Sequence, residues 1–192
     1  GERTELGELM QPASVGFNMD LLSESGTAIN SEEFSYDYTI DTADQSTKVA
    51  MTLNLSADAY IKYTYTIYNT SNPSRDYLID FDIVEHNIAK HLAANESLKL
   101  TWRSRSNKNE RSYQNENMAT NIIYFEDGDI EEFDTSGEKE TLENISWIAY
   151  KQQYFTSAFI SSENLMAEAE FKNSTKQGAD FMKDFKSTIS LP

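Results

Sequence analysis

The sequence predicts an all-β protein, a large antiparallel β-sandwich with little helix. Hydrophobic and polar residues alternate with a period of two in one segment after another, as expected for strands with one buried and one solvated face. Polar turn signals separate these segments, and 11 Tyr and 10 Phe supply aromatic side chains that favour strands. About nine to eleven strands at this spacing indicate a sandwich.

Four segments show the alternation most clearly. They are residues 48–55, 60–69, 76–84 and 98–106. In the first of them, Val49, Met51 and Leu53 alternate with Lys48 and Thr52. Because successive side chains of a strand point to opposite faces, each segment is expected to bury one face and to pair antiparallel with its neighbours.

Turn residues join the predicted strands. An Asn-Pro turn in residues 71–76 leads into the segment 76–84, where Tyr77 and Ile79 are expected to point inward. The sequence "EDGD", residues 126–129, predicts a tight Asp-Gly hairpin. Further strands are predicted over residues 34–40, 165–171 and 179–190. The last of these would also suit one face of a helix.

The length of 192 residues is most simply that of one domain. Residues 1–33 are rich in Ser and Glu and are expected to form a loosely ordered lead-in. Residues 34–192 are expected to form a single β-sandwich. The abrupt start and the end directly after a strand-like segment predict that the chain is an excised fragment of a larger protein.

The charge balance argues against nucleic acid and anionic membrane as main partners. Acidic residues number 32 against 16 basic, a net charge of −16, and such a surface repels polyanions. One basic cluster stands out, and we interpret it as a solvated strand end and loop rather than an anion site. Its members are Arg103, Arg105, Lys108 and Arg111.

Composition also excludes several classes of site. There is no cysteine, which excludes disulfides, thiolate zinc sites and cysteine nucleophiles. No apolar run approaches the ~18 residues that span a bilayer, so the fragment is expected to be soluble. The sequence contains no nucleophile elbow, P-loop, dinucleotide fingerprint or zinc-protease motif.

The remaining candidates for chemistry are interpreted as solvated residues. His86 and His91 are the only histidines, and a spacing of five suits neither one strand face nor one helical face, even with Glu85 beside them. The acidic turn at Asp127 and Asp129 lacks the spaced ligands of a calcium loop. We therefore predict no catalytic residue, no bound cofactor and no metal site, and a chain that is not an enzyme.

The most distinctive segment is "WIAYKQQYFTSAFIS", Trp147 to Ser161. Both of its alternating faces carry large apolar side chains, which predicts a core strand covered on both sides. Gln152 and Gln153 would then point to opposite faces, and each buried amide would need hydrogen-bond partners.

This segment closely resembles a motif of the large periplasmic domain, called P1, of the YidC family of bacterial membrane protein insertases. The "AYIKYTYTI" and "YLIDFDIVEHNI" segments upstream are similar to family strands in the same order. The resemblance covers about residues 34–192. We expect the matching residues to be structural core positions of the family. They are Trp147, Ala149, Gln152, Gln153, Tyr154, Phe155 and Ile160.

The resemblance implies a supersandwich of the galactose-mutarotase-like kind and a non-catalytic role. Family members insert and fold inner-membrane proteins, alone or with the Sec translocon. The implied partners are therefore nascent inner-membrane proteins and Sec translocon subunits, with no nucleic acid. The implied location is the periplasmic face of the inner membrane, attached only through transmembrane helices that this chain lacks.

A second class of function is weighed beside the first. The same fold hosts sugar epimerases, so a carbohydrate-binding or aldose-epimerase-like protein is the alternative. That function would need an aromatic cleft with a carboxylate and a histidine, and only His86 or His91 could supply the latter.

Overall fold

The computed structural model describes residues 15–69, 71–93, 98–133, 140–162, 166–175 and 180–190. Within these residues the chain is almost entirely strand, joined by one short α-helix and three 3₁₀ turns, and every strand pairing is antiparallel. The predicted all-β antiparallel class with little helix is confirmed. No helix in the described part is long and apolar enough to cross a membrane.

The chain divides into two compact units, which we describe separately. Unit 1 comprises Gly1–Asp20 and Ser97–Pro192, and unit 2 comprises Leu21–Glu96. The predictions were one domain over residues 34–192 and a loose lead-in before it. Residues 15–22 of that lead-in form a strand that pairs with residues 99–104. This pairing joins residues that lie 79 to 89 positions apart in the chain, which local sequence composition does not reveal.

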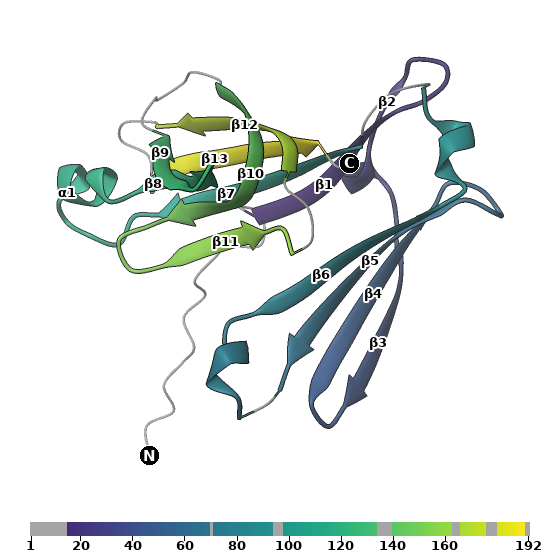
Figure 1. Ribbon diagram of the computed structural model, residues 1–192, viewed down its shortest axis with the longest axis horizontal. Helices are drawn as coiled ribbons and strands as arrows, with labels where there is room; N and C mark the ends of the chain where they lie inside the picture. The colour runs from purple at the N-terminus through teal and green to yellow at the C-terminus, as the bar shows by residue number, and fades with distance from the viewer. Residues whose placement is uncertain are drawn as a thin grey trace. The chain divides into compact units, whose positions relative to one another are not determined.

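Unit 1 is built on one large sheet (Figure 1). Within unit 1 the strand order is β1-β7-β13-β12-β10-β8-β9, and β11 pairs with β10 outside this path. The strands are β1 (Val15–Leu22), β7 (Lys99–Asn107), β8 (Asn121–Glu126), β9 (Asp129–Phe133), β10 (Glu140–Lys151), β11 (Thr156–Ile160), β12 (Met166–Ser174) and β13 (Phe181–Ser190). The short strand β2 (Ala28–Asn30) belongs to unit 2. The helix α1 (Tyr113–Met118) precedes β8.

Tyr150 shows that this sheet curls until its strands face one another. Its ring on β10 stacks on Trp102 of β7, with centroids 3.8 Å apart, although β13 and β12 lie between these strands in the sheet. The Tyr150 hydroxyl donates to the Trp102 carbonyl oxygen at 2.8 Å and lies 2.8 Å from Ser187 Oγ on β13. Unit 1 thus has the facing layers of a β-sandwich within one sheet.

Aromatic rings fill the space between these layers. Phe17 stacks on Trp102 at 5.8 Å, and Phe185 stacks on Tyr150 at 4.9 Å. Phe159 of β11 lies 5.8 Å from Phe17, so the last strand of the hairpin also covers this cluster. Burial removes Tyr150 from water and raises the pKa of its hydroxyl far above the usual value.

Unit 2 contains a four-stranded meander in the order β3-β4-β5-β6 (Figure 1). The strands are β3 (Asp37–Ala43), β4 (Ser46–Asn54), β5 (Tyr60–Tyr68) and β6 (Ile79–His86). The predicted strands at 48–55 and 60–69 are confirmed within one or two residues. Three 3₁₀ turns flank the strands: η2 (Ser31–Glu33), η3 (Pro73–Arg75) and η4 (Ile88–His91).

The start of β6 differs from the expectation that Tyr77 points inward. The η3 turn precedes it, and Tyr77 has a left-handed φ of 66° and a fully exposed side chain. The Asn-Pro signal therefore extends the turn by several residues, and the strand begins only at Ile79. The Ile79 side chain is exposed as well.

Two other sequence predictions are confirmed. β8 and β9 form the expected hairpin, in which Asp127 and Gly128 both have positive φ, as a two-residue type I′ turn requires. Residues 181–190 form a strand rather than a helix, because β13 pairs with both β7 and β12.

The substitution Tyr150→Phe tests whether the hydrogen bonds of the Tyr150 hydroxyl stabilise the curled sheet. It leaves the ring in place but removes the hydroxyl from two buried partners, so the free energy of unfolding is expected to fall by ~1–3 kcal/mol. Urea denaturation measures this change. Tyr154→Phe in the same unit is the control, because that side chain is exposed and the expected change is within ~0.5 kcal/mol. If both substitutions lower the free energy of unfolding by the same amount, the Tyr150 hydroxyl does not stabilise the curled sheet.

Candidate interaction surfaces

The segment Trp147–Ser161 is a hairpin rather than the single core strand that was predicted. β10 runs to Lys151 and β11 begins at Thr156, and these two residues are paired. The backbone N–H of Gln152 donates to the Phe155 carbonyl oxygen at 2.8 Å and closes the turn. Hydrophobic alternation continues through the reversal without Gly, Pro or Asn, and so the pattern did not indicate a turn.

The seven motif residues are distributed along this hairpin, from its core end to its tip. Ala149 is buried, and its neighbours Ile148 and Tyr150 are buried too. This confirms that β10 is covered on both faces at that point. The other motif positions differ from the expected core. Trp147 and Gln152 are half-buried, Gln153 is exposed, and Tyr154, Phe155 and Ile160 are 58%, 45% and 59% exposed.

The position of the glutamines differs from the expected one. Gln152 and Gln153 lie in the turn, where solvent reaches them, and not on opposite faces of a buried strand. Gln153 Nε2 lies 3.4 Å from the Tyr154 hydroxyl, which donates in turn to the Glu110 carboxylate. The residue that sequence reasoning missed is Tyr150, which stands in the quoted motif but received no role.

The histidines and acidic residues that were considered as possible metal ligands do not form a common site. The exposed His86 ring stacks on Tyr60 at 5.1 Å, and its Nε2 lies 3.1 Å from Asn87 Nδ2. His91 is half-buried in η4. The Asp127 turn is an exposed hairpin tip. Across the residues that the structure describes, no three His, Asp or Glu side chains gather into a group that could hold a metal ion.

The sheet of unit 2 has one apolar and one polar face. Strand registers align Tyr38 with Met51 and Tyr63, and each of these positions carries an apolar or aromatic side chain. We call this side of the sheet the apolar face. Its members are Tyr38, Ile40, Val49, Met51, Leu53, Ile61, Tyr63, Tyr65, Ile67, Ile79, Phe81 and Ile83.

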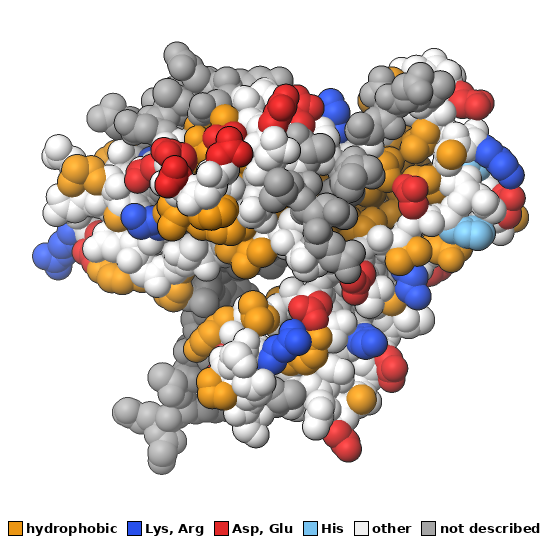
Figure 2. Space-filling view, in the orientation of Figure 1, with side chains coloured by type: hydrophobic (Ala, Val, Ile, Leu, Met, Phe, Trp, Pro, Cys, Tyr) orange, Lys and Arg blue, Asp and Glu red, His pale blue; other side chains and the backbone are white. Residues whose placement is uncertain are grey.

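Burial along the apolar face changes from one end to the other. Leu53 and Ile61 are fully buried at one end, and burial also raises the pKa of Tyr63. On the edge strand β3, by contrast, Tyr38 is 71% and Ile40 62% exposed. Figure 2 shows hydrophobic side chains interspersed with polar and charged ones at the surface over the strands of unit 2. Exposed apolar side chains that share one face of a sheet are candidates for an interaction surface.

The opposite side of the same sheet is polar. The register aligns Thr39 with Ala50 and Thr64, and Thr64 with Asp82. The two sides of this sheet therefore differ in chemistry, and only one of them suits a hydrophobic partner.

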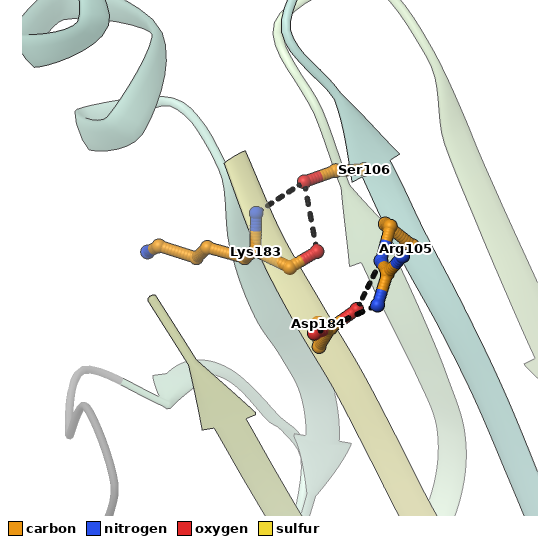
Figure 3. A network of polar contacts seen from close by, with 4 residues as sticks. All are labelled: Arg105, Ser106, Lys183 and Asp184. Atoms are coloured by element: carbon orange, nitrogen blue, oxygen red, sulfur yellow. Dashed lines mark hydrogen bonds and ion pairs between the residues drawn. The ribbon is translucent and has the colours of Figure 1, made fainter. Parts of the chain in front are cut away.

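Two of the predicted basic residues lie on the outer, exposed face of β7 in unit 1. They are Arg103 and Arg105, and the other two follow the end of the strand and are exposed. Arg105 Nε donates to Asp184 Oδ1 at 2.7 Å, and Nη2 donates to Oδ2 at 3.3 Å (Figure 3). The guanidinium also lies over the Phe181 ring, 4.2 Å from its centroid. Arg105 is thus held against β13 rather than freely solvated.

A β-bulge next to this ion pair sets the directions of the side chains. The register of β13 against β7 shifts between Phe181 and Lys183. Ser106 Oγ accepts from the Lys183 amide at 2.9 Å and donates to its carbonyl oxygen at 3.2 Å (Figure 3). The Lys183 side chain is buried and donates to Asn121 Oδ1 at 2.5 Å. Past the bulge, Asp184 lies opposite Arg105 on the outer face.

Comparisons with known proteins give one consistent result. The family model described as "YidC periplasmic domain" matches residues 8–191. The proteins named "Membrane protein insertase YidC" of Azobacteroides pseudotrichonymphae and Bacteroides fragilis are 26% and 27% identical over 188 residues. These matches cover 96% and 95% of this chain but 29% of each relative, so the chain spans less than a third of their length. No solved structure matches.

Substituting Trp147 by Ala tests the half-buried position of the motif tryptophan. The ring stacks on Phe125 at 6.0 Å but is partly solvated, so the expected loss of stability is about 1–2 kcal/mol, below the ~3–5 kcal/mol of a fully buried Trp. Chemical denaturation measures the loss. Phe155→Ala at the exposed tip is the matched variant, with an expected change within ~0.5 kcal/mol. If Trp147→Ala instead lowers the free energy of unfolding by ~4 kcal/mol, Trp147 is a fully buried core residue, as the sequence pattern predicts.

Proposed function

Because the chain belongs to the YidC periplasmic domain family, we propose that it is the non-catalytic periplasmic part of a membrane protein insertase. In this role it assists the insertion and folding of inner-membrane proteins, with or without the Sec translocon. The observation that carries the proposal is the family match over residues 8–191, nearly the whole chain.

The relatives support the same proposal and set its scope. Each of the two cited is named as a membrane protein insertase, and this chain corresponds to 29% of its length. We assign attachment to the membrane to parts of the full-length protein that correspond to the remaining length. The domain itself is assigned to the periplasmic side of the inner membrane.

The apolar face of unit 2 is the surface that we assign to client proteins. A nascent inner-membrane protein carries hydrophobic segments that are exposed until they enter the bilayer. Tyr38 and Ile40 offer an apolar contact on an edge strand, where backbone groups are also open to pairing. The hydrophobic effect is non-directional, so such a surface can accept many client sequences without specific recognition.

Site-specific photo-crosslinking in the full-length insertase tests this assignment. A photoreactive residue at position 38 or 40 is expected to form adducts with a nascent inner-membrane protein during its synthesis. Positions 39 and 41 are the matched controls, because they alternate onto the polar face of the same strand. Equal adduct yields at all four positions would contradict the role of the apolar face.

Association with the translocon is tested separately. The full-length protein, purified under mild conditions, is expected to bring Sec translocon subunits with it. The absence of Sec subunits from material that still crosslinks to clients would limit the function to insertion without the translocon.

A further inference from the structure

The strand β3 lies at one end of the sheet of unit 2. On its inner side it pairs with β4 along its whole length, and among the described residues no strand pairs with its outer side. All seven residues of β3 are exposed, with Tyr38 at 71% and Ile40 at 62%. The outer side of β3 therefore presents a row of backbone N–H and C=O groups that can pair with another strand.

This edge lacks most of the features that usually prevent such pairing. Edge strands are commonly short, interrupted by proline or a bulge, or rich in charge. The edge strand β9 of unit 1 has five residues, of which three are acidic. In contrast, β3 has seven residues, no proline and an unbroken register with β4. Its acidic residues Asp37 and Asp41 alternate onto the polar side, so the apolar side of the edge carries no charge.

The apolar side of β3 is complementary to itself. In an antiparallel pair of two copies of β3 with a two-fold axis at Ile40, this residue lies opposite Ile40 of the second copy. Tyr38 then lies opposite Thr42, a pairing of an aromatic with a β-branched side chain that stabilises antiparallel sheets. The apolar side of such a pair therefore contains only favourable contacts.

The polar side selects the same register. With the axis at Ile40, Thr39 lies opposite Asp41 and can donate a hydrogen bond to its carboxylate, while Asp37 lies opposite Ala43. An axis at Thr39 would instead set Asp37 opposite Asp41, and an axis at Asp41 would set that carboxylate opposite itself. Like charges directly opposite each other are destabilising, so the register centred on Ile40 is favoured over both neighbours.

We propose that β3 pairs antiparallel with β3 of a second copy of this chain, with the two-fold axis at Ile40. The two four-stranded sheets then continue into each other, and their apolar faces adjoin. This inference goes beyond the proposed function, because it uses the backbone edge of β3, whereas the contact with clients uses side chains on the apolar face. Pairing at the edge leaves that face uncovered.

The association is expected to be weak and to strengthen with added salt. A single strand edge buries less than the ~1,200 Å² of a stable interface. Each copy has a net charge of −16, and the Asp41 carboxylates of the two copies are diagonal neighbours, so the copies repel each other. Salt screens this repulsion and is expected to lower the dissociation constant.

Oxidative crosslinking of single-cysteine variants tests the pairing and its register. The chain contains no cysteine, so each variant has one thiol. Directly opposed residues of antiparallel strands have Cα atoms ~4.5–5.5 Å apart, a distance that a disulfide bridges. Ile40→Cys is therefore expected to form a covalent dimer. Thr42→Cys on the same side is the matched control, because the two copies of this position lie about 14 Å apart and are expected to stay monomeric.

A mixture of two variants tests the register further. Tyr38→Cys and Thr42→Cys are each expected to stay monomeric alone and to form a mixed dimer together. Equal yields of dimer for Ile40→Cys and Thr42→Cys would overturn the proposal, and so would the absence of dimer for Ile40→Cys. If that absence is found while position 40 crosslinks to a client in the full-length insertase, the client occupies β3, and the proposed function stands without the dimer.

Sedimentation equilibrium measures the same association without a thiol. The wild-type chain is expected to self-associate reversibly at concentrations up to about 1 mM. Ile40→Lys sets two ammonium groups opposite each other on the axis and is expected to raise the dissociation constant about fivefold or more. Ile130→Lys on the edge strand β9 is the control, because it adds the same charge at an isoleucine of similar exposure, 67%. Equal weakening by the two substitutions, or a wild-type chain that stays monomeric, would contradict the pairing.

Discussion

The architecture of unit 1 depends on how Tyr150 is buried. Its ring stacks on Trp102 and its hydroxyl contacts both the Trp102 carbonyl and Ser187, so one side chain ties β10 to β7 and β13. A phenol hydroxyl that is buried without a partner costs ~1–3 kcal/mol, and the Tyr150 hydroxyl avoids this cost because it has two partners. This tie keeps the large sheet curled around its aromatic core, and the hairpin at the end of β10 continues from it.

The curl decides which side chains remain outside. With Trp102, Phe185 and Ser187 turned into the core, the alternating positions Arg103 and Lys186 must lie on the outer face. Unit 2 follows the same rule of alternation, but part of its apolar side is exposed along β3. The candidate surface for a hydrophobic partner in this family member is therefore the apolar face of unit 2.

Periodicity predicted the elements well because each strand is a local pattern. β4, β5, β7 and the β8–β9 hairpin lie where alternation and an Asp-Gly turn placed them. The turn at Gln152 was missed because apolar alternation continues through it, and the strand at 15–22 was missed because its pairing is long-range. The contacts of Tyr150 with β7 and β13 depend on register and curvature, which no single segment encodes.

The central functional claim is that the apolar face of unit 2 binds hydrophobic segments of client proteins. Fluorescence anisotropy of a labelled peptide from such a segment, titrated with this chain, measures the contact directly. The account predicts saturable binding that is lost in Tyr38→Ser/Ile40→Ser and kept in Thr39→Ser/Asp41→Asn, whose positions lie on the polar face. Binding that is equal in both variants, or absent from the wild-type chain, would contradict it.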